Sequence, residues 1–99
     1  MEVDISKLDP RGFFTDSEKE TIILIGDLVY QRGYKYVCYT LMEKVYLGRR
    51  GEYSWHTIER CVRRLANKYK LLIKLDTRRG CYKPSEAFKS IYWRLKTHD

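Results

Sequence analysis

The sequence predicts a small α+β domain that is mostly helical and carries one short β-hairpin near its carboxyl end. The evidence for helices is a set of apolar residues that recur every three or four positions, in segments 16–31, 40–47, 54–69 and 85–99. Between residues 71 and 84 this period gives way to two short runs typical of strands, with a turn between them. A length of 99 residues with 43% hydrophobic content suits a single core.

Residues 1–15 are expected to form an amino-terminal arm. They mix charged residues with Pro10 and Gly12 and show no sustained hydrophobic period. Phe13 and Phe14 are too apolar to remain in water together, so we expect the end of the arm to dock on the core or on a second copy of the chain.

The first long helix is expected from about Asp16 to Gln31. Thr15 and Glu18 match the capping-box pattern, in which each side chain accepts a hydrogen bond from a backbone N–H at the helix start. Gly33 follows and can end the helix in the left-handed conformation. Apolar residues cover more of this helix than one neighbour could bury, so we expect it at the centre of the core or in a dimer seam.

A short strand (34–37) and a second helix (40–47, with Tyr39 as an alternative start) are expected next, followed by a glycine-rich break at 48–51. A basic helix then runs from about residue 54 to 69, with Ser54 able to cap its start. Its apolar residues repeat with helical spacing and are Ile58, Val62, Leu65 and Tyr69. Since side chains between these positions point the other way, the opposite face is basic.

The hairpin and one more helix complete the domain. Residues 71–75 are expected as the first strand, 76–80 as a turn that carries Arg78 and Arg79, and 81–83 as the returning strand. The last helix, 85–99, is apolar at Phe88, Ile91, Tyr92 and Leu95. Three regions follow: an arm (1–15), a main domain (16–84) and a carboxyl-terminal helix that is a candidate for a dimer seam.

The charge balance indicates an anionic partner. Twenty Lys and Arg against thirteen Asp and Glu give a net charge of +7, which favours nucleic acid first and an acidic membrane or protein second. No run approaches the roughly 18 apolar residues that a spanning helix needs, and the amino terminus lacks the pattern of a signal peptide. We therefore expect a cytoplasmic protein with no membrane contact.

Enzyme and metal functions find little support in the sequence. Cys38, Cys61 and Cys81 are separated by long, unequal intervals, without the paired C-x-x-C of a zinc site. His56 has no neighbouring acid or nucleophile motif, and no glycine-rich phosphate loop occurs. We expect no catalysis, no cofactor and no small-molecule ligand.

The three cysteines leave at least one thiol unpaired or available for an intermolecular bond. Cys61 falls on the apolar side of its helix and is expected to act as a small buried hydrophobic residue. A Cys38–Cys61 bridge is one possible pairing. Nine Tyr, many charges and few amides are typical of proteins from hot environments, whose cytosol tolerates disulfides.

The order helix, short strand, helix, basic helix, hairpin, helix resembles the winged-helix variant of the helix-turn-helix DNA-binding family over residues 16–84. The most telling residues are Ile58, Val62 and Leu65, followed by Leu71 and Leu72. Two features depart from the family: Lys70 stands where many members have Gly, and the turn at 48–53 is long. In size and architecture the chain is similar to small regulators of archaea and of crenarchaeal viruses and plasmids.

This resemblance implies that the basic helix is a recognition helix and the hairpin a wing. The candidates on the helix for base and phosphate contact are Ser54, His56, Thr57, Arg60, Arg63 and Arg64. Arg60 is best suited to bidentate contact with guanine. The alternative is a solvated face that pairs with Glu59. Trp55 could cover the turn or contact DNA.

Two further pairs of arginines are candidates for DNA contact. Arg78 and Arg79 at the hairpin tip suit a minor groove beside the main site, although basic residues are also common at exposed turns. Arg49 and Arg50 could touch flanking phosphates.

The leading expectation is a sequence-specific transcription regulator that binds double-stranded DNA as a homodimer. The dimer is expected to pair through the first and last helices, since their apolar surface exceeds what one small core can use. A winged-helix protein-interaction adaptor is one alternative. A replication or packaging accessory that binds nucleic acid without sequence preference is another.

Overall fold

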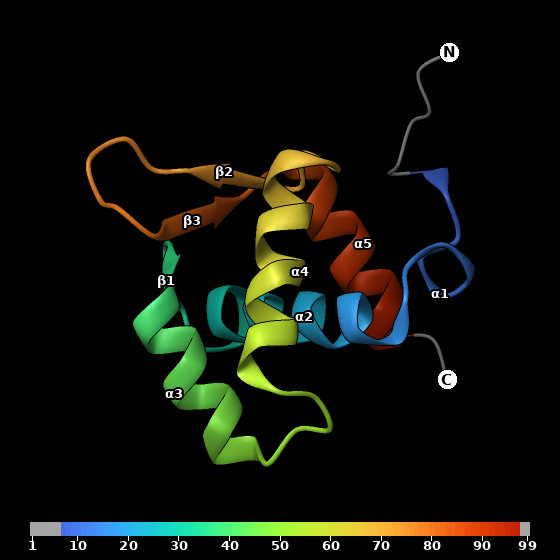
Figure 1. Ribbon diagram of the computed structural model, residues 1–99. Helices are drawn as coiled ribbons and strands as arrows, with labels where there is room; N and C mark the ends of the chain where they lie inside the picture. Colours follow the sequence, from blue (N-terminus) through green and yellow to red (C-terminus); the bar gives the residue numbers. More distant parts are fainter. Residues whose placement is uncertain (1–6, 98–99) are drawn as a thin grey trace.

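The computed structural model describes residues 7–97, which form a mostly helical domain with a small three-stranded antiparallel sheet (Figure 1). The predicted α+β class is confirmed. In chain order the elements are α1 (Pro10–Phe13), α2 (Asp16–Gly26), η2 (Asp27–Gln31), β1 (Val37–Cys38), α3 (Tyr39–Arg49), α4 (Trp55–Asn67), β2 (Leu72–Lys74), β3 (Cys81–Pro84) and α5 (Glu86–Thr97).

The end of the predicted arm is folded, not irregular. Asp9 caps the short helix α1 by accepting a hydrogen bond from the Arg11 N–H, and Pro10 fits the first turn because its missing N–H is not needed there. Phe14 is buried, whereas Phe13 is 42% exposed. Both rings contact Tyr69, so the arm does dock on the core of its own chain. Residues 1–6 lie outside the described part.

The predicted helix 16–31 is two elements joined end to end. The capping box is present: Thr15 Oγ1 accepts from the Glu18 N–H, and the Glu18 carboxylate accepts from the Thr15 N–H. After Gly26 the coil widens into the π-helix η2. Gly26, directly before this widening, has no room for a side chain, because an added Cβ would overlap the ring of Tyr92 on α5. Sequence periodicity does not reveal this local change of pitch.

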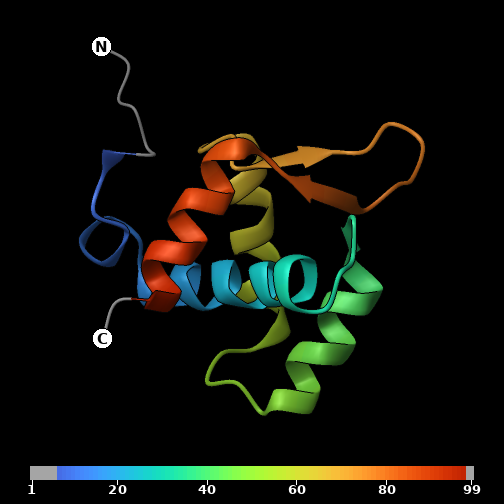
Figure 2. The ribbon, with the colours of Figure 1, turned by 180° about the vertical axis from the view of Figure 1, so that it is seen from behind.

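The helix α2 packs against both α4 and α5, and α4 lies in front of it in Figure 1 and behind it in Figure 2. Its apolar residues Ile22, Leu24 and Ile25 are fully buried, which confirms its central position. The apolar residues of α5 are also buried within the same chain; they are Phe88, Ile91, Tyr92 and Leu95. These side chains are therefore not surplus surface that a second copy must cover.

The sheet has the order β1-β3-β2, with β3 in the middle. The expected strand 34–37 is wrong in its first three residues, because the Tyr34 N–H bonds back to the Leu28 carbonyl and keeps this segment at the helix end. Only Val37 and Cys38 pair with β3. The predicted hairpin is present, although its first strand is shorter than expected.

A disulfide joins Cys38 to Cys81. These residues face each other directly in the β1–β3 pair, so the Cys38–Cys61 alternative is wrong. Cys61 instead points toward α2, where its thiol lies 3.5 Å from the Ser17 hydroxyl. It is buried and unpaired, as expected of a small core residue.

Lys70, in the connection between α4 and β2, has an unusual backbone conformation. Helix α4 ends at Asn67, and Lys70 then adopts φ of +57°, in the left-handed region that favours glycine. This conformation lets the Leu71 N–H bond to the Leu65 carbonyl at 2.8 Å and turns the chain into the hairpin. Lys70 therefore takes the backbone conformation for which glycine would have been the simpler choice.

Candidate nucleic-acid interface

Helix α4 presents a polar stripe to solvent along its whole length. The stripe consists of His56, Arg60, Arg63 and Asn67, spaced by four, three and four residues and all exposed. The His56 side chain is 88% exposed and that of Arg63 is 56% exposed. On the opposite face Ile58, Val62 and Leu65 are fully buried. The predicted division of this helix into a core face and an exposed basic face is therefore present.

The first turn of α4 is fixed by two hydroxyl groups. The Ser54 Oγ accepts a hydrogen bond from the Thr57 N–H at 3.3 Å, and the two side-chain oxygens lie 3.2 Å apart. Ser54 is exposed and Thr57 partly so. The side chains of Ser54 and His56 at the helix start are thus exposed to solvent.

Trp55 has a packing role. It is partly buried against the core, and its ring lies edge-on to that of Tyr39 with centroids 6.4 Å apart. This contact joins the start of α4 to the start of α3.

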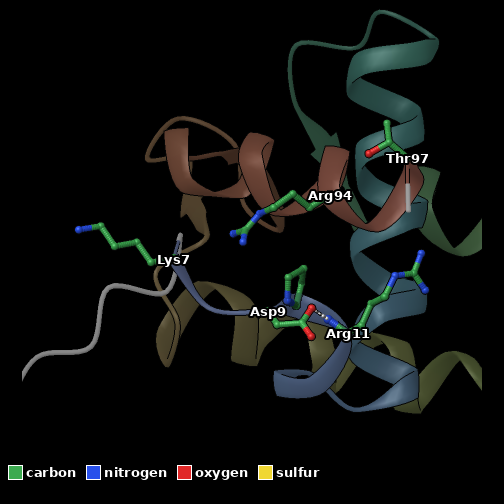
Figure 3. A pocket seen from close by; sticks show the side chains of 6 residues that line it. Lys7, Asp9, Arg11, Arg94 and Thr97 are labelled. Atoms are coloured by element: carbon green, nitrogen blue, oxygen red, sulfur yellow. Dashed lines mark hydrogen bonds between the residues drawn. The ribbon is translucent and has the colours of Figure 1, made fainter. Parts of the chain in front are cut away.

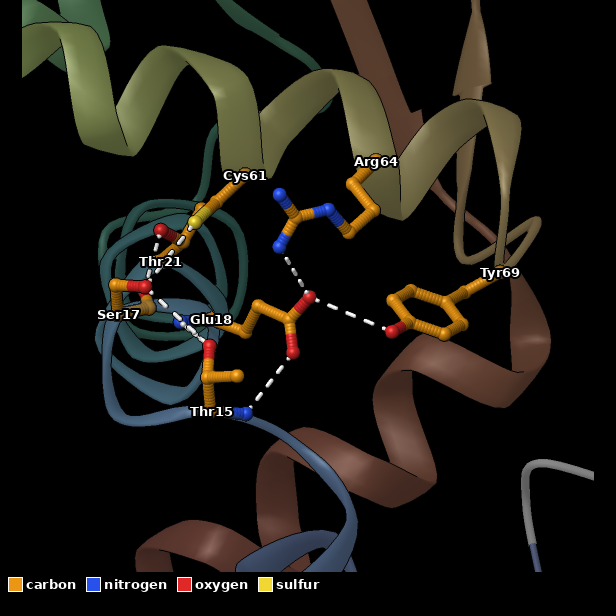
Figure 4. A network of polar contacts seen from close by, with 7 residues as sticks. All are labelled: Thr15, Ser17, Glu18, Thr21, Cys61, Arg64 and Tyr69. Carbon is orange, nitrogen blue, oxygen red and sulfur yellow. Dashed lines mark hydrogen bonds and ion pairs between the residues drawn. The ribbon is translucent and has the colours of Figure 1, made fainter.

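Arg64 is separated from the other candidates on α4. Its Nη1 donates to a Glu18 carboxylate oxygen at 2.8 Å, and Glu18 is only 1% exposed (Figure 4). Tyr69 donates to the same oxygen. Burial alone would raise the pKa of Glu18, but hydrogen bonds from Arg64 and from the Thr15 N–H and the charge of Arg64 outweigh it, so the pKa lies below its usual value. Arg64 links α4 to α2.

Arg63 has an acidic partner on the surface of α4. The Arg63 guanidinium pairs with the Glu59 carboxylate at 3.1 Å, across one turn of the exposed surface. The His56 ring also approaches Glu59, at 3.9 Å. The expected alternative, a solvated face that pairs with Glu59, therefore describes Arg63, and a phosphate would have to compete with this carboxylate.

The hairpin projects away from the helices, to the left in Figure 1. Arg78 and Arg79 lie at its tip and are exposed. The Arg78 guanidinium lies 5.4 Å from the centre of the Tyr36 ring, a cation–π distance. Gly80, with φ of +75°, completes the turn. Tyr36 therefore orients one of the two tip arginines.

The hairpin and the start of α3 meet at a pair of tyrosines. The hydroxyls of Tyr39, at the start of α3, and Tyr82, in β3, lie 2.7 Å apart. Burial and the neighbouring Tyr82 hydroxyl raise the pKa of Tyr39, while the charge of Arg63 opposes the shift. Arg63 on the exposed stripe therefore lies near the base of the hairpin.

Arg49 and Arg50 lie at the end of α3, far from the hairpin in Figure 1. Arg49 pairs with Asp27 at 3.1 Å, and Asp27 also accepts a hydrogen bond from the Tyr92 hydroxyl. Arg50 is exposed and has φ of +55°. Arg49 thus connects α3 to the helices behind it, whereas Arg50 faces solvent.

Four residues on or beside this surface were not predicted from the sequence: Asn67, Tyr36, Tyr39 and Tyr82. Asn67 follows Arg63 at the same helical spacing as the rest of the stripe, so the periodicity contained the signal. The tyrosines gave no such signal, because their positions depend on the pairing of β1 with β3.

A hollow lies on the opposite side of the domain from the hairpin. An open cavity of about 380 Å³ between α1 and α5 is lined by Lys7, Asp9, Pro10, Arg11, Arg94 and Thr97 (Figure 3). Arg94 donates to the Leu8 carbonyl and Arg11 to the Leu95 carbonyl, and these hydrogen bonds attach the arm to α5. Both guanidinium groups therefore have a structural role.

Neither a cluster of metal ligands nor a membrane-spanning helix is found among residues 7–97. No group of three or more His, Cys, Asp or Glu side chains there is arranged to hold a metal ion. None of the described helices has the length and apolar character to cross a membrane. No protein-family model, curated protein or solved structure matches the chain.

Proposed function

We propose that the chain is a winged-helix protein that binds double-stranded DNA, with α4 as the recognition helix and the β2–β3 hairpin as the wing. The observation that carries the proposal is the exposed stripe of α4, which includes Arg60, next to a projecting hairpin with Arg78 and Arg79 at its tip. An α-helix fits the major groove, and basic residues on an adjoining hairpin reach neighbouring phosphates or the minor groove.

Individual roles follow from the partners of each side chain. Arg60 has room for bidentate contact with guanine, while His56 and the hydroxyls of Ser54 and Thr57 lie at the end of α4 that enters a groove first. Arg63 changes partner from Glu59 to a phosphate on binding. Arg64 stays with Glu18 and contributes through the fold, because leaving that buried carboxylate unpaired would be costly.

The preferred biological role is a sequence-specific transcription regulator that acts without a cofactor. Selection of bound duplexes from a random pool, followed by sequencing, tests this role. A regulator should enrich one motif and bind it tightly over competitor DNA, whereas an accessory protein binds many sequences and an adaptor shows only weak, salt-labile binding.

Arg60→Ala provides the residue-level test on the selected duplex. Affinity should fall by about 1–3 kcal/mol and the preference at one base pair should relax, since the lost contact is to a base. Lys89→Ala is the control, because it removes an exposed positive charge from α5. Equal affinity of the Arg60 variant and the wild type would remove α4 from the interface.

A further inference from the structure

The Cys38–Cys81 disulfide lies where the hairpin joins the rest of the domain. Its residues occupy the second of the two residue pairs that β1 forms with β3. The next pair along contains a backbone hydrogen bond from the Tyr39 N–H to the Gly80 carbonyl. Because hydrogen-bonded and non-hydrogen-bonded pairs alternate in antiparallel strands, the cysteines occupy a non-hydrogen-bonded pair, in which opposed side chains come closest.

Within residues 7–97, noncovalent contacts also hold the hairpin to the segment from Tyr36 to Tyr39. They include the short β1–β3 pairing with the Tyr39–Gly80 backbone hydrogen bond, the contact of Tyr39 with Tyr82, and the Arg78 guanidinium over the Tyr36 ring. Cys38 is also the N-cap residue of α3, and its side chain makes no capping hydrogen bond. The disulfide is therefore the one covalent tie between the hairpin and the start of α3.

We propose that the Cys38–Cys81 disulfide is a redox-sensitive link that holds the hairpin in its DNA-binding position, so that reduction by a dithiol weakens binding. The proposal rests on the proposed function and adds regulation to the same surface. In the oxidised protein Arg78 and Arg79 are held at a fixed place relative to the exposed stripe of α4. In the reduced protein the hairpin samples more positions, and ordering it on DNA costs conformational entropy.

The chemistry is thiol–disulfide exchange. One thiolate of the dithiol attacks the sulfur of Cys38, which is the more exposed of the two cysteines, and Cys81 leaves as a thiolate that takes up a proton. The second thiol of the reagent then attacks the mixed disulfide as its thiolate, and Cys38 leaves and is protonated. The protein gains two electrons and two protons, and the dithiol becomes a cyclic disulfide.

The experiment measures affinity for the selected duplex before and after dithiothreitol treatment, with thiol titration to confirm the redox state and circular dichroism to confirm the fold. Reduction should weaken binding by about three- to tenfold, since it loosens contacts to about two phosphates. Cys61→Ser should respond like the wild type because it keeps the disulfide. The pair Cys38→Ser and Cys81→Ser should bind like the reduced protein in both conditions.

The pair Arg78→Ala and Arg79→Ala shows whether the effect passes through the hairpin tip. In that background reduction should change affinity little, whereas with Arg50→Ala the full response should remain. If the serine pair does not fold, Cys38→Val with Cys81→Val replaces it, since β-branched residues suit a strand. Equal binding by fully oxidised and fully reduced wild type would overturn the proposal. An oxidised protein that binds no duplex would instead refute the proposed function.

Discussion

Glu18 shows how one residue can serve two parts of the fold. One carboxylate oxygen completes the cap of α2, while the other accepts from Arg64 on α4 and from Tyr69 beyond it (Figure 4). Among residues 7–97 it is the one buried acidic side chain. A buried carboxylate is tolerated here because each of its oxygens accepts a hydrogen bond, one from the Thr15 N–H and the other from Arg64.

Replacement of Glu18 by Gln should lower the free energy of unfolding at neutral pH by about 1–3 kcal/mol, since the partly exposed Arg64 guanidinium loses the charge of its buried partner. The wild type should also lose stability in acid. Because the pKa of Glu18 is lowered by folding, its contribution is present above pH 4.5, the ordinary value, and is lost as the pH falls through the folded-state pKa.

Urea unfolding of both proteins from neutral pH down to pH 3 measures this prediction. The difference between wild type and variant should shrink toward the acid end. Glu59→Gln is the control, since the Glu59–Arg63 pair is on the surface and is worth less than about 1 kcal/mol. A constant difference at every pH would show that the charge of Glu18 does not contribute.

At the scale of elements, the contact between α2 and α5 leaves no room for a side chain at position 26. Gly26 is buried, and the ring of Tyr92 occupies the space where a side chain would be. The Tyr92 hydroxyl then reaches Asp27 at the start of η2, which also accepts from Arg49 of α3. The close approach thus connects three helices at one point.

Gly26→Ala should therefore destabilise the protein by at least about 1–3 kcal/mol, although alanine is the better helix former, because the added methyl group overlaps Tyr92. Gly48→Ala is the matched control. Gly48 lies in α3 with no neighbouring atom within 4 Å, so there the change should stabilise by about 0.5–1 kcal/mol. Thermal unfolding of the two variants should shift in opposite directions, and a stable Gly26→Ala protein would contradict the packing.

The elements also show what sequence patterns could and could not predict. Helical spacing placed Ile58, Val62 and Leu65 in the core and left Arg60 outside, because burial follows a period that the sequence displays. Helical spacing did not predict that Arg64, unlike Arg63, binds a buried carboxylate, since Glu18 lies 46 positions away in the sequence. The Cys38–Cys81 pair and the tyrosine contact depend in the same way on which strands pair, and local sequence does not encode that choice.

At the scale of the whole molecule, oligomeric state remains a prediction. The apolar residues of α5 that suggested pairing fill the core of one chain, but Trp93 on α5 is 36% exposed and Phe13 on α1 is 42% exposed. Both belong to the regions expected to face a partner. A homodimer would carry two α4 helices to half-sites about one turn of DNA apart, roughly 34–36 Å, and would select an inverted repeat.

Sedimentation equilibrium at about tens of micromolar should therefore show a dimer that Trp93→Glu converts to a folded monomer, because that ring lies partly in solvent and its replacement leaves the core filled. Ile91→Glu is the contrasting variant. Ile91 is fully buried, so a carboxylate there should unfold the chain and not merely separate two copies. A monomeric wild type would remove the dimer and predict a single, non-repeated binding site.

The attachment of α1 to the last turns of α5 has a practical consequence. Lys7 and Thr97, at the two limits of the described chain, line the same cavity, on the opposite side of Figure 1 from the hairpin. A fluorophore or a surface tether added at either residue would therefore start at the α1–α5 side of the domain, away from the hairpin tip. Single-molecule and immobilised formats should be usable from both positions without obstructing the hairpin.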